Sequence, residues 1–83
     1  MKLSSIHFDQ LRRFLLDLGF TEERQRSGWR FEHVPSDTVL LLRAYRPGDC
    51  VYAHDLVMVR SHLDWRGLMA ADAFEDSLAK TPA

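Results

Sequence analysis

Four histidines and one cysteine are the side chains of this sequence best suited to bind a metal ion or to work as a nucleophile and base. Cys50 and His54 are four residues apart, and His54 and His62 are eight apart. Zinc sites usually combine two close ligand pairs, such as Cys-x-x-Cys and His-x3-His, and no such combination occurs here. A phosphate-cradling glycine loop, a nucleophile elbow and a Rossmann fingerprint are also absent. The sequence therefore predicts no metal site and no cofactor.

Arginine and aromatic side chains are interleaved in the middle of the chain, a pattern typical of sheets that bind RNA. In such sheets the arginines hold phosphates while a neighbouring aromatic ring stacks on a base. The candidate nucleic-acid contacts are Trp29, Arg30, Arg43 and Arg46.

The charge balance favours a second interpretation of the same arginines. The chain has 11 basic and 12 acidic side chains and a net charge of -1, whereas RNA affinity depends on a basic excess that displaces counterions. Any RNA contact should therefore be weak and salt-sensitive. The alternative is cross-strand ion pairing on a solvated face, for example of Arg30 or Arg43 with Glu32.

Length and composition fit one globular domain over residues 1–83. Hydrophobic residues make up 46% and charged residues 28%, which excludes a disordered tail. A single cysteine cannot form an internal disulfide, and neither a secretory signal nor a bilayer-spanning stretch is found. A cytoplasmic protein without membrane contact is expected.

A first helix is expected from about His7 to Leu18, where apolar residues recur at helical spacing. Ser4 or Ser5 would cap its start. Gly19 would end it in a left-handed conformation, which lets Phe20 fold back onto the helix.

The period then changes from helical to alternating, which predicts strands joined by short turns as antiparallel hairpins. In the second of them Trp29, Phe31 and His33 share one face. The expected strands are 20–25, 29–34 and 38–45, with a type I turn at 35–37.

Two more helices are expected, from about His54 to Arg66 and from about Ala70 to Ala79. The order α-β-β-β-α plus a short C-terminal helix predicts an α+β fold, with helices packed on one face of a single-layer, three-stranded antiparallel sheet. The last helix would cover Met58 and Trp65, which lie on the outer side of the helix before it.

The third expected strand is apolar on both faces, although helices can cover only one of them. In a simple meander this strand is also an edge strand, whose free backbone groups invite pairing. Val39 and Leu41 fall on the uncovered face. They predict an interface with a second copy of the chain or with a small protein partner.

Two short segments carry a family resemblance. One is Leu18-Gly19-Phe20, and the other is Ser27-Gly28-Trp29-Arg30-Phe31-Glu32-His33-Val34-Pro35. Together with the order of elements over residues 14–74, they resemble the HicA family of small toxins from bacterial toxin–antitoxin pairs. The resemblance implies a double-stranded-RNA-binding-like fold, cleavage of mRNA and an antitoxin-like partner.

The resemblance places Trp29 where the family has its catalytic histidine. Indole has no nitrogen that titrates near neutral pH, so it cannot act as a general acid or base. The family's second histidine position holds Val34, and His33 lies one residue earlier, which turns its side chain to the other face of the strand. The resemblance thus implies a retained scaffold with lost nuclease chemistry.

Three functional hypotheses follow. The first is a catalytically inactive HicA-like module that binds RNA through the arginines and Trp29. The second is a protein-interaction module that assembles through its third strand, as a homodimer or with an antitoxin-like partner. The third is an active ribonuclease that uses His33 or His62.

Overall fold

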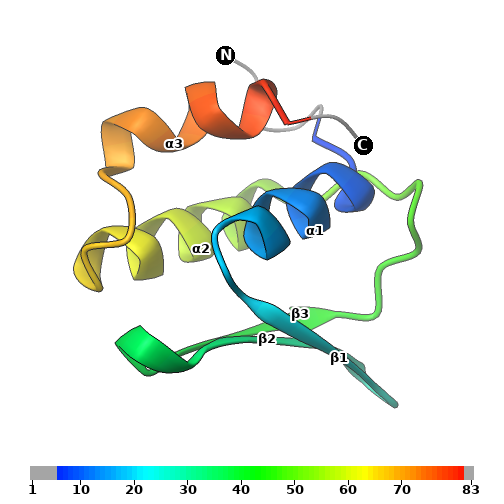
Figure 1. The fold of residues 1–83 in the computed structure, drawn as a ribbon. Coiled ribbons are helices and arrows are strands. Elements are labelled where there is room, and N and C mark those ends of the chain that lie inside the picture. The colour runs from blue at the N-terminus through cyan, green and yellow to red at the C-terminus, as the bar shows by residue number, and fades with distance from the viewer. Residues whose placement is uncertain (1–5, 82–83) are drawn as a thin grey trace.

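The helices of this protein all lie on one side of a small sheet. The structure, a computed structural model, describes residues 6–81. Its elements are α1 (Phe8–Asp17), β1 (Thr21–Gln25), β2 (Gly28–His33), the 3₁₀ turn η2 (Val34–Ser36), β3 (Thr38–Arg43), α2 (Ala53–Trp65) and α3 (Ala71–Ala79). The strands form an antiparallel sheet in the order β1-β2-β3; α1 and α2 cover one face of it, and α3 lies beyond them (Figure 1). The predicted fold class and element order are confirmed.

The first helix forms because its apolar side chains fall on one side, where they enter the core. Its N-cap position is His7, whose side chain makes no capping hydrogen bond. The predicted caps, Ser4 and Ser5, lie outside the described residues. The buried residues of α1 are Phe8, Leu11, Phe14 and Leu15.

The end of α1 turns the chain back toward the sheet. Gly19 has a φ of 101°, which favours glycine, and the Phe20 N–H donates to the Leu15 carbonyl oxygen at 3.1 Å. The predicted helix ending is confirmed, and α2 ends in the same way at Gly67, with a φ of 70°. This turn of the chain places Phe20 in the core.

Alternation along β2 and β3 separates a helix-facing side from an open side. Phe31 is fully buried, and the Trp29 ring lies 5.2 Å from the Phe8 ring. His33 lies on the same side, with its ring 5.3 Å from that of Phe20. The predicted shared face of the second strand is confirmed.

Two strands end earlier than the sequence predicts. Val34 begins the η2 turn, because the following Pro35 has no N–H to donate to a sheet ladder. Where the sequence predicts a type I turn at 35–37, the structure has this single 3₁₀ turn, which is followed by Asp37 in the left-handed conformation. The third strand stops at Arg43, where the Tyr45 N–H donates to the Arg43 carbonyl oxygen at 2.7 Å and bends the chain.

The core is closed without a partner. Phe8 is its centre, with ring centroids of Trp29, Phe31 and Tyr45 at 5.2, 6.4 and 5.4 Å. The accessible surface of 5059 Å² matches the value of about 5,100 Å² expected for a folded monomer of this mass. The fold therefore does not depend on association for its burial. No helix within residues 6–81 is long and apolar enough to cross a membrane.

The prediction that the last helix covers Trp65 is wrong. Trp65 is 76% exposed, whereas Met58 packs partly buried against the core. The reason is the direction of α3, which also packs on α1 and sets the Phe74 ring edge-on against the Phe14 ring at 5.5 Å. Trp65 is the last residue of α2 and stays outside this contact.

We expect Gly28→Ala to destabilise the fold, because the added Cβ would lie 2.1 Å from the Leu42 carbonyl oxygen on the neighbouring strand. Relieving this clash requires the β2–β3 ladder to open, at a cost of about 1–3 kcal/mol or more. Urea unfolding measures the loss. Gly48→Ala is the matched control, since its Cβ would meet nothing within 4 Å; equal stability of the two variants would contradict the close approach.

Candidate functional site

The side of the sheet opposite the helices has no layer over it in the described part of the chain (Figure 1). We call it the open sheet face. The strand registers place on it the side chains of Thr21, Glu23, Gln25, Arg30, Glu32, Val39, Leu41 and Arg43.

Exposed aliphatic side chains lie along the β3 side of the open sheet face. Leu41 is 64% exposed, and Val39 is exposed beside it. Val34, in the turn that leads into β3, is 70% exposed. Among residues 6–81 β3 pairs only with β2, so its other edge is free. The structure thus brings the two predicted interface residues together on an uncovered edge strand.

The open sheet face carries side chains of both charges. Arg30 and Glu32 form an ion pair of 3.0 Å along β2 itself, rather than the expected cross-strand pair. Glu23 lies opposite Arg30 in the register. With Arg43 at the end of β3, the face carries two acidic and two basic side chains.

Trp29, the predicted stacking residue for RNA, lies on the helix side of the sheet. Its Nε1–H donates to the Tyr45 carbonyl oxygen at 3.1 Å, and the Arg24 guanidinium lies 5.2 Å from its ring centroid. Arg30 belongs to the opposite face. Alternation along one strand separates the two, so the structure does not gather the predicted RNA contacts on one surface.

The other two predicted RNA contacts lie at the connection from β3 to α2. Arg43 ends β3, and Arg46 is exposed in the loop that follows. RNA binding stays a prediction, now split over separate surfaces.

The histidines considered for catalysis are held by local contacts. His33 Nδ1 and Ser36 Oγ share a hydrogen bond of 2.7 Å, and Ser36 Oγ lies 2.7 Å from Thr38 Oγ1. The His62 ring lies 5.7 Å from the Trp65 ring. Neither histidine forms an ion pair with a carboxylate among residues 6–81.

The metal-ligating residue types do not gather. Cys50 Sγ lies 3.9 Å from His7 Nδ1, while His54 Nε2 lies 3.4 Å from a carboxylate oxygen of Asp55. No group of three or more His, Cys, Asp or Glu side chains within residues 6–81 is placed to hold a metal ion.

Sequence reasoning missed a polar cluster that joins β3 to α2. We call it the Asp55 cluster: Arg43, Tyr45, Tyr52, His54 and Asp55. The Tyr45 hydroxyl donates to Asp55 Oδ2 at 2.5 Å, and Arg43 Nε donates to the same oxygen at 2.9 Å. The Tyr52 N–H donates to the Tyr45 hydroxyl oxygen at 3.0 Å. The one local signal was an acidic residue in the first turn of a helix, which did not reveal its partners.

These hydrogen bonds shift two pKa values. Burial acts to raise the pKa of Asp55, but hydrogen bonds from Tyr45 and Arg43 outweigh it and hold that pKa below its ordinary value. Burial and the hydrogen bond to Asp55 raise the pKa of Tyr45 to about 12. At neutral pH the cluster therefore holds a carboxylate and a neutral phenol.

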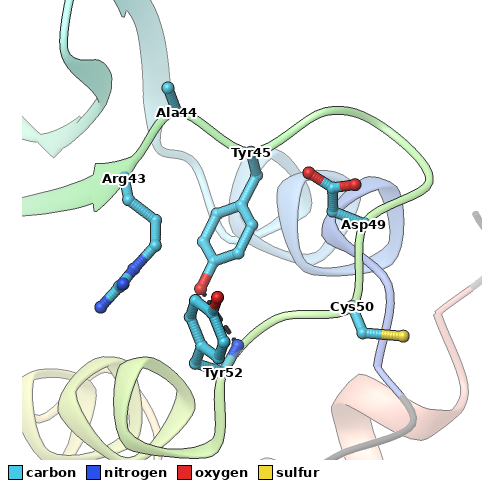
Figure 2. Close-up of a pocket in the computed structure, with 6 residues that line it drawn as sticks. All are labelled: Arg43, Ala44, Tyr45, Asp49, Cys50 and Tyr52. Carbon is cyan, nitrogen blue, oxygen red and sulfur yellow. Dashed lines mark hydrogen bonds between the residues drawn. The ribbon is translucent and has the colours of Figure 1, made fainter.

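A pocket of about 440 Å³ opens beside the Asp55 cluster (Figure 2). Two tyrosine rings lie at its centre, with a guanidinium on one side and a carboxylate and a thiol on the other. The lining residues are Arg43, Ala44, Tyr45, Asp49, Cys50 and Tyr52.

A scan of protein-family models, a search of curated proteins and a search of solved structures each found no match to this chain. The HicA resemblance therefore rests on its two short motifs and on the order of elements.

We expect Asp55→Asn to lower the free energy of unfolding by about 1–3 kcal/mol at neutral pH, because it weakens charge-assisted hydrogen bonds. The pKa of Asp55 is lower in the folded than in the unfolded chain. Its contribution is thus complete above about pH 5 and declines below about pH 4.

Urea unfolding of both proteins between pH 7 and pH 3 measures this effect, and the difference should shrink toward acid pH. Asp17→Asn is the control, since Asp17 forms only an exposed i,i+4 pair with Arg13. A constant difference at every pH would contradict the assigned role.

Proposed function

We propose that this chain is a protein-interaction module that associates with a second copy of itself through the open sheet face. The observation that carries the proposal is Leu41, a leucine 64% exposed on an edge strand. With Val39, two residues earlier on the same face, it forms an apolar row that no described element covers. Such rows beside unpaired strand edges are typical of association sites.

Charge favours a second copy over a strongly charged partner. The open sheet face holds Glu23 and Glu32 beside Arg30, and the Arg43 guanidinium at its end is turned to Asp55. Two faces of mixed sign and small net charge repel each other little. Packing of the two open sheet faces against each other around a two-fold axis brings the same apolar side chains into contact, as an isologous interface requires.

The size of the face predicts a weak dimer. Three strands of five or six residues present a face of about 15 by 20 Å, or about 300 Å². Stable specific complexes bury about 800 Å² on each partner. Because the monomer already closes its own core, we expect reversible association rather than an obligate dimer.

The HicA-like hypothesis has less support from the geometry. Arg30 pairs with Glu32, which lowers the positive charge that the open sheet face offers to phosphates, and the Arg43 guanidinium is turned away from that face toward Asp55. Trp29 is packed among core rings. An antitoxin-like partner on the open sheet face remains compatible with the apolar row and is an outcome of the test below.

We expect sedimentation velocity to show concentration-dependent dimerisation at tens of micromolar, and Leu41→Asp to abolish it, because a carboxylate would be buried against apolar side chains. Trp65→Asp is the matched control, as Trp65 is at least as exposed but lies on α2, away from the open sheet face. A monomer at every concentration would refute self-association. Association lost only in Trp65→Asp would move the interface to the helices.

We expect the purified protein to leave RNA intact, with His33→Ala giving the same result. His33 is engaged with Ser36 and packed on Phe20, and no titratable side chain stands at position 29. Gel analysis of a labelled RNA tests this. Cleavage by the wild type that disappears in His33→Ala would establish the ribonuclease hypothesis instead.

A further inference from the structure

The pocket at the β3–α2 connection is a second site, separate from the apolar row of β3. Its volume of about 440 Å³ is within the range of roughly 300–1,000 Å³ for small-molecule sites. The pocket is built from Arg43, the last residue of β3, and from loop residues that follow it, so a ligand there does not need the rest of the open sheet face.

The walls of the pocket are held in place by contacts to the rest of the fold. Tyr45 is buried, and its ring stacks on Phe8 at 5.4 Å. On the far side of the loop the Asp49 carbonyl oxygen accepts the Phe8 N–H at 2.8 Å, and the Val51 N–H donates to the Ile6 carbonyl oxygen at 2.9 Å. A site fixed in this way loses little conformational entropy on binding.

One side of the pocket is suited to an anion. The Arg43 guanidinium lies 4.5 Å from the Tyr52 ring centroid, and its Nε and Nη2 atoms donate to Asp55. These contacts fix its orientation. Its Nη1 atom has no acceptor among residues 6–81. An oriented guanidinium with free N–H groups is a donor for phosphate oxygens.

The centre and far side are suited to a flat ring that carries hydrogen-bond donors. Tyr52 is 55% exposed and presents an aromatic surface for stacking. Asp49 lies across the tyrosines from Arg43 (Figure 2). Its Oδ2 atom accepts the Arg46 N–H at 2.9 Å, and the same carboxylate can accept further donors from a ligand.

We propose that this pocket binds a guanine mononucleotide, with the phosphate at Arg43, the base beside Tyr52 and the base N–H groups at Asp49. Arg43 and Asp49 lie on opposite sides of the tyrosines. An amino acid carries its ammonium and carboxylate groups on one carbon, whereas the sugar of a nucleotide separates the phosphate from the base. A nucleotide can therefore reach both Arg43 and Asp49. A carboxylate accepts two adjacent donors from guanine, the ring N–H and the 2-amino group, but only the 6-amino group of adenine.

The test is a titration of the ¹⁵N-labelled full chain with GMP, IMP, AMP and guanosine. We expect saturable shifts of the Ala44, Asp49, Cys50 and Tyr52 amides by GMP, with a dissociation constant of about 1 mM or below. Affinity should fall from GMP to IMP, which lacks the 2-amino group, and should be lowest for AMP, whose ring N1 is an acceptor facing the carboxylate. Guanosine, which lacks the phosphate, should bind more weakly than GMP.

Asp49→Asn keeps an oxygen for the Arg46 N–H but loses the negative charge. It should lower the affinity for GMP by about tenfold and leave the affinity for AMP little changed. Asp64→Asn, an exposed carboxylate on α2, is the control and should match the wild type. Cys50 gives a second readout, because it is the single cysteine and lines the pocket. Bound GMP should slow its alkylation by iodoacetamide.

Absence of saturable shifts up to about 10 mM GMP, equal affinity for GMP and AMP, or shifts confined to other residues would each overturn the proposal. The proposed self-association is measured separately, by sedimentation without nucleotide, so either can fail while the other holds.

Discussion

The arrangement of sheet and helices depends on the hydrogen bonds that the Asp55 carboxylate accepts. The chain leaves β3 at Arg43 and must return to begin α2 at Ala53, so a loop of residues 44–52 separates the two elements. Asp55 joins its two ends, because it accepts hydrogen bonds from Tyr45 and Arg43 on the β3 side. A nearly buried carboxylate is costly unless charge-assisted donors surround it, and here they do. The same contacts orient the Arg43 guanidinium that borders the pocket.

The open sheet face is uncovered because the helices of the described residues pack on the other side. Within residues 6–81, α1 and α2 cover one face of the sheet, and α3 packs on these two helices (Figure 1). No element remains for the other side within residues 6–81. Leu41 and Val39 therefore stay exposed, although the total accessible surface is that expected for a folded monomer. This combination, a closed core beside an exposed apolar row, fits reversible association better than obligate assembly.

Arg43 belongs to both candidate sites. It is the last residue of the open sheet face and also one wall of the pocket. Its guanidinium, however, is turned to Asp55 and Tyr52, away from the apolar row on β3. The two sites therefore differ in chemistry: one presents aliphatic side chains and a free strand edge, the other presents charged and aromatic groups in a hollow.

The sequence by itself determined the element order, the helix ending at Gly19, the shared face of Trp29, Phe31 and His33, and the exposure of Leu41. These features depend on local periodicity and on backbone preferences, which neighbouring residues carry. Only the tertiary structure decided that Trp29 packs under the helices, that α3 leaves Trp65 exposed, and that Arg43 pairs with Asp55 rather than Glu32. Each of these outcomes is a contact between residues distant in the chain. Such contacts depend on how whole elements pack, and side-chain periodicity carries no information about that packing.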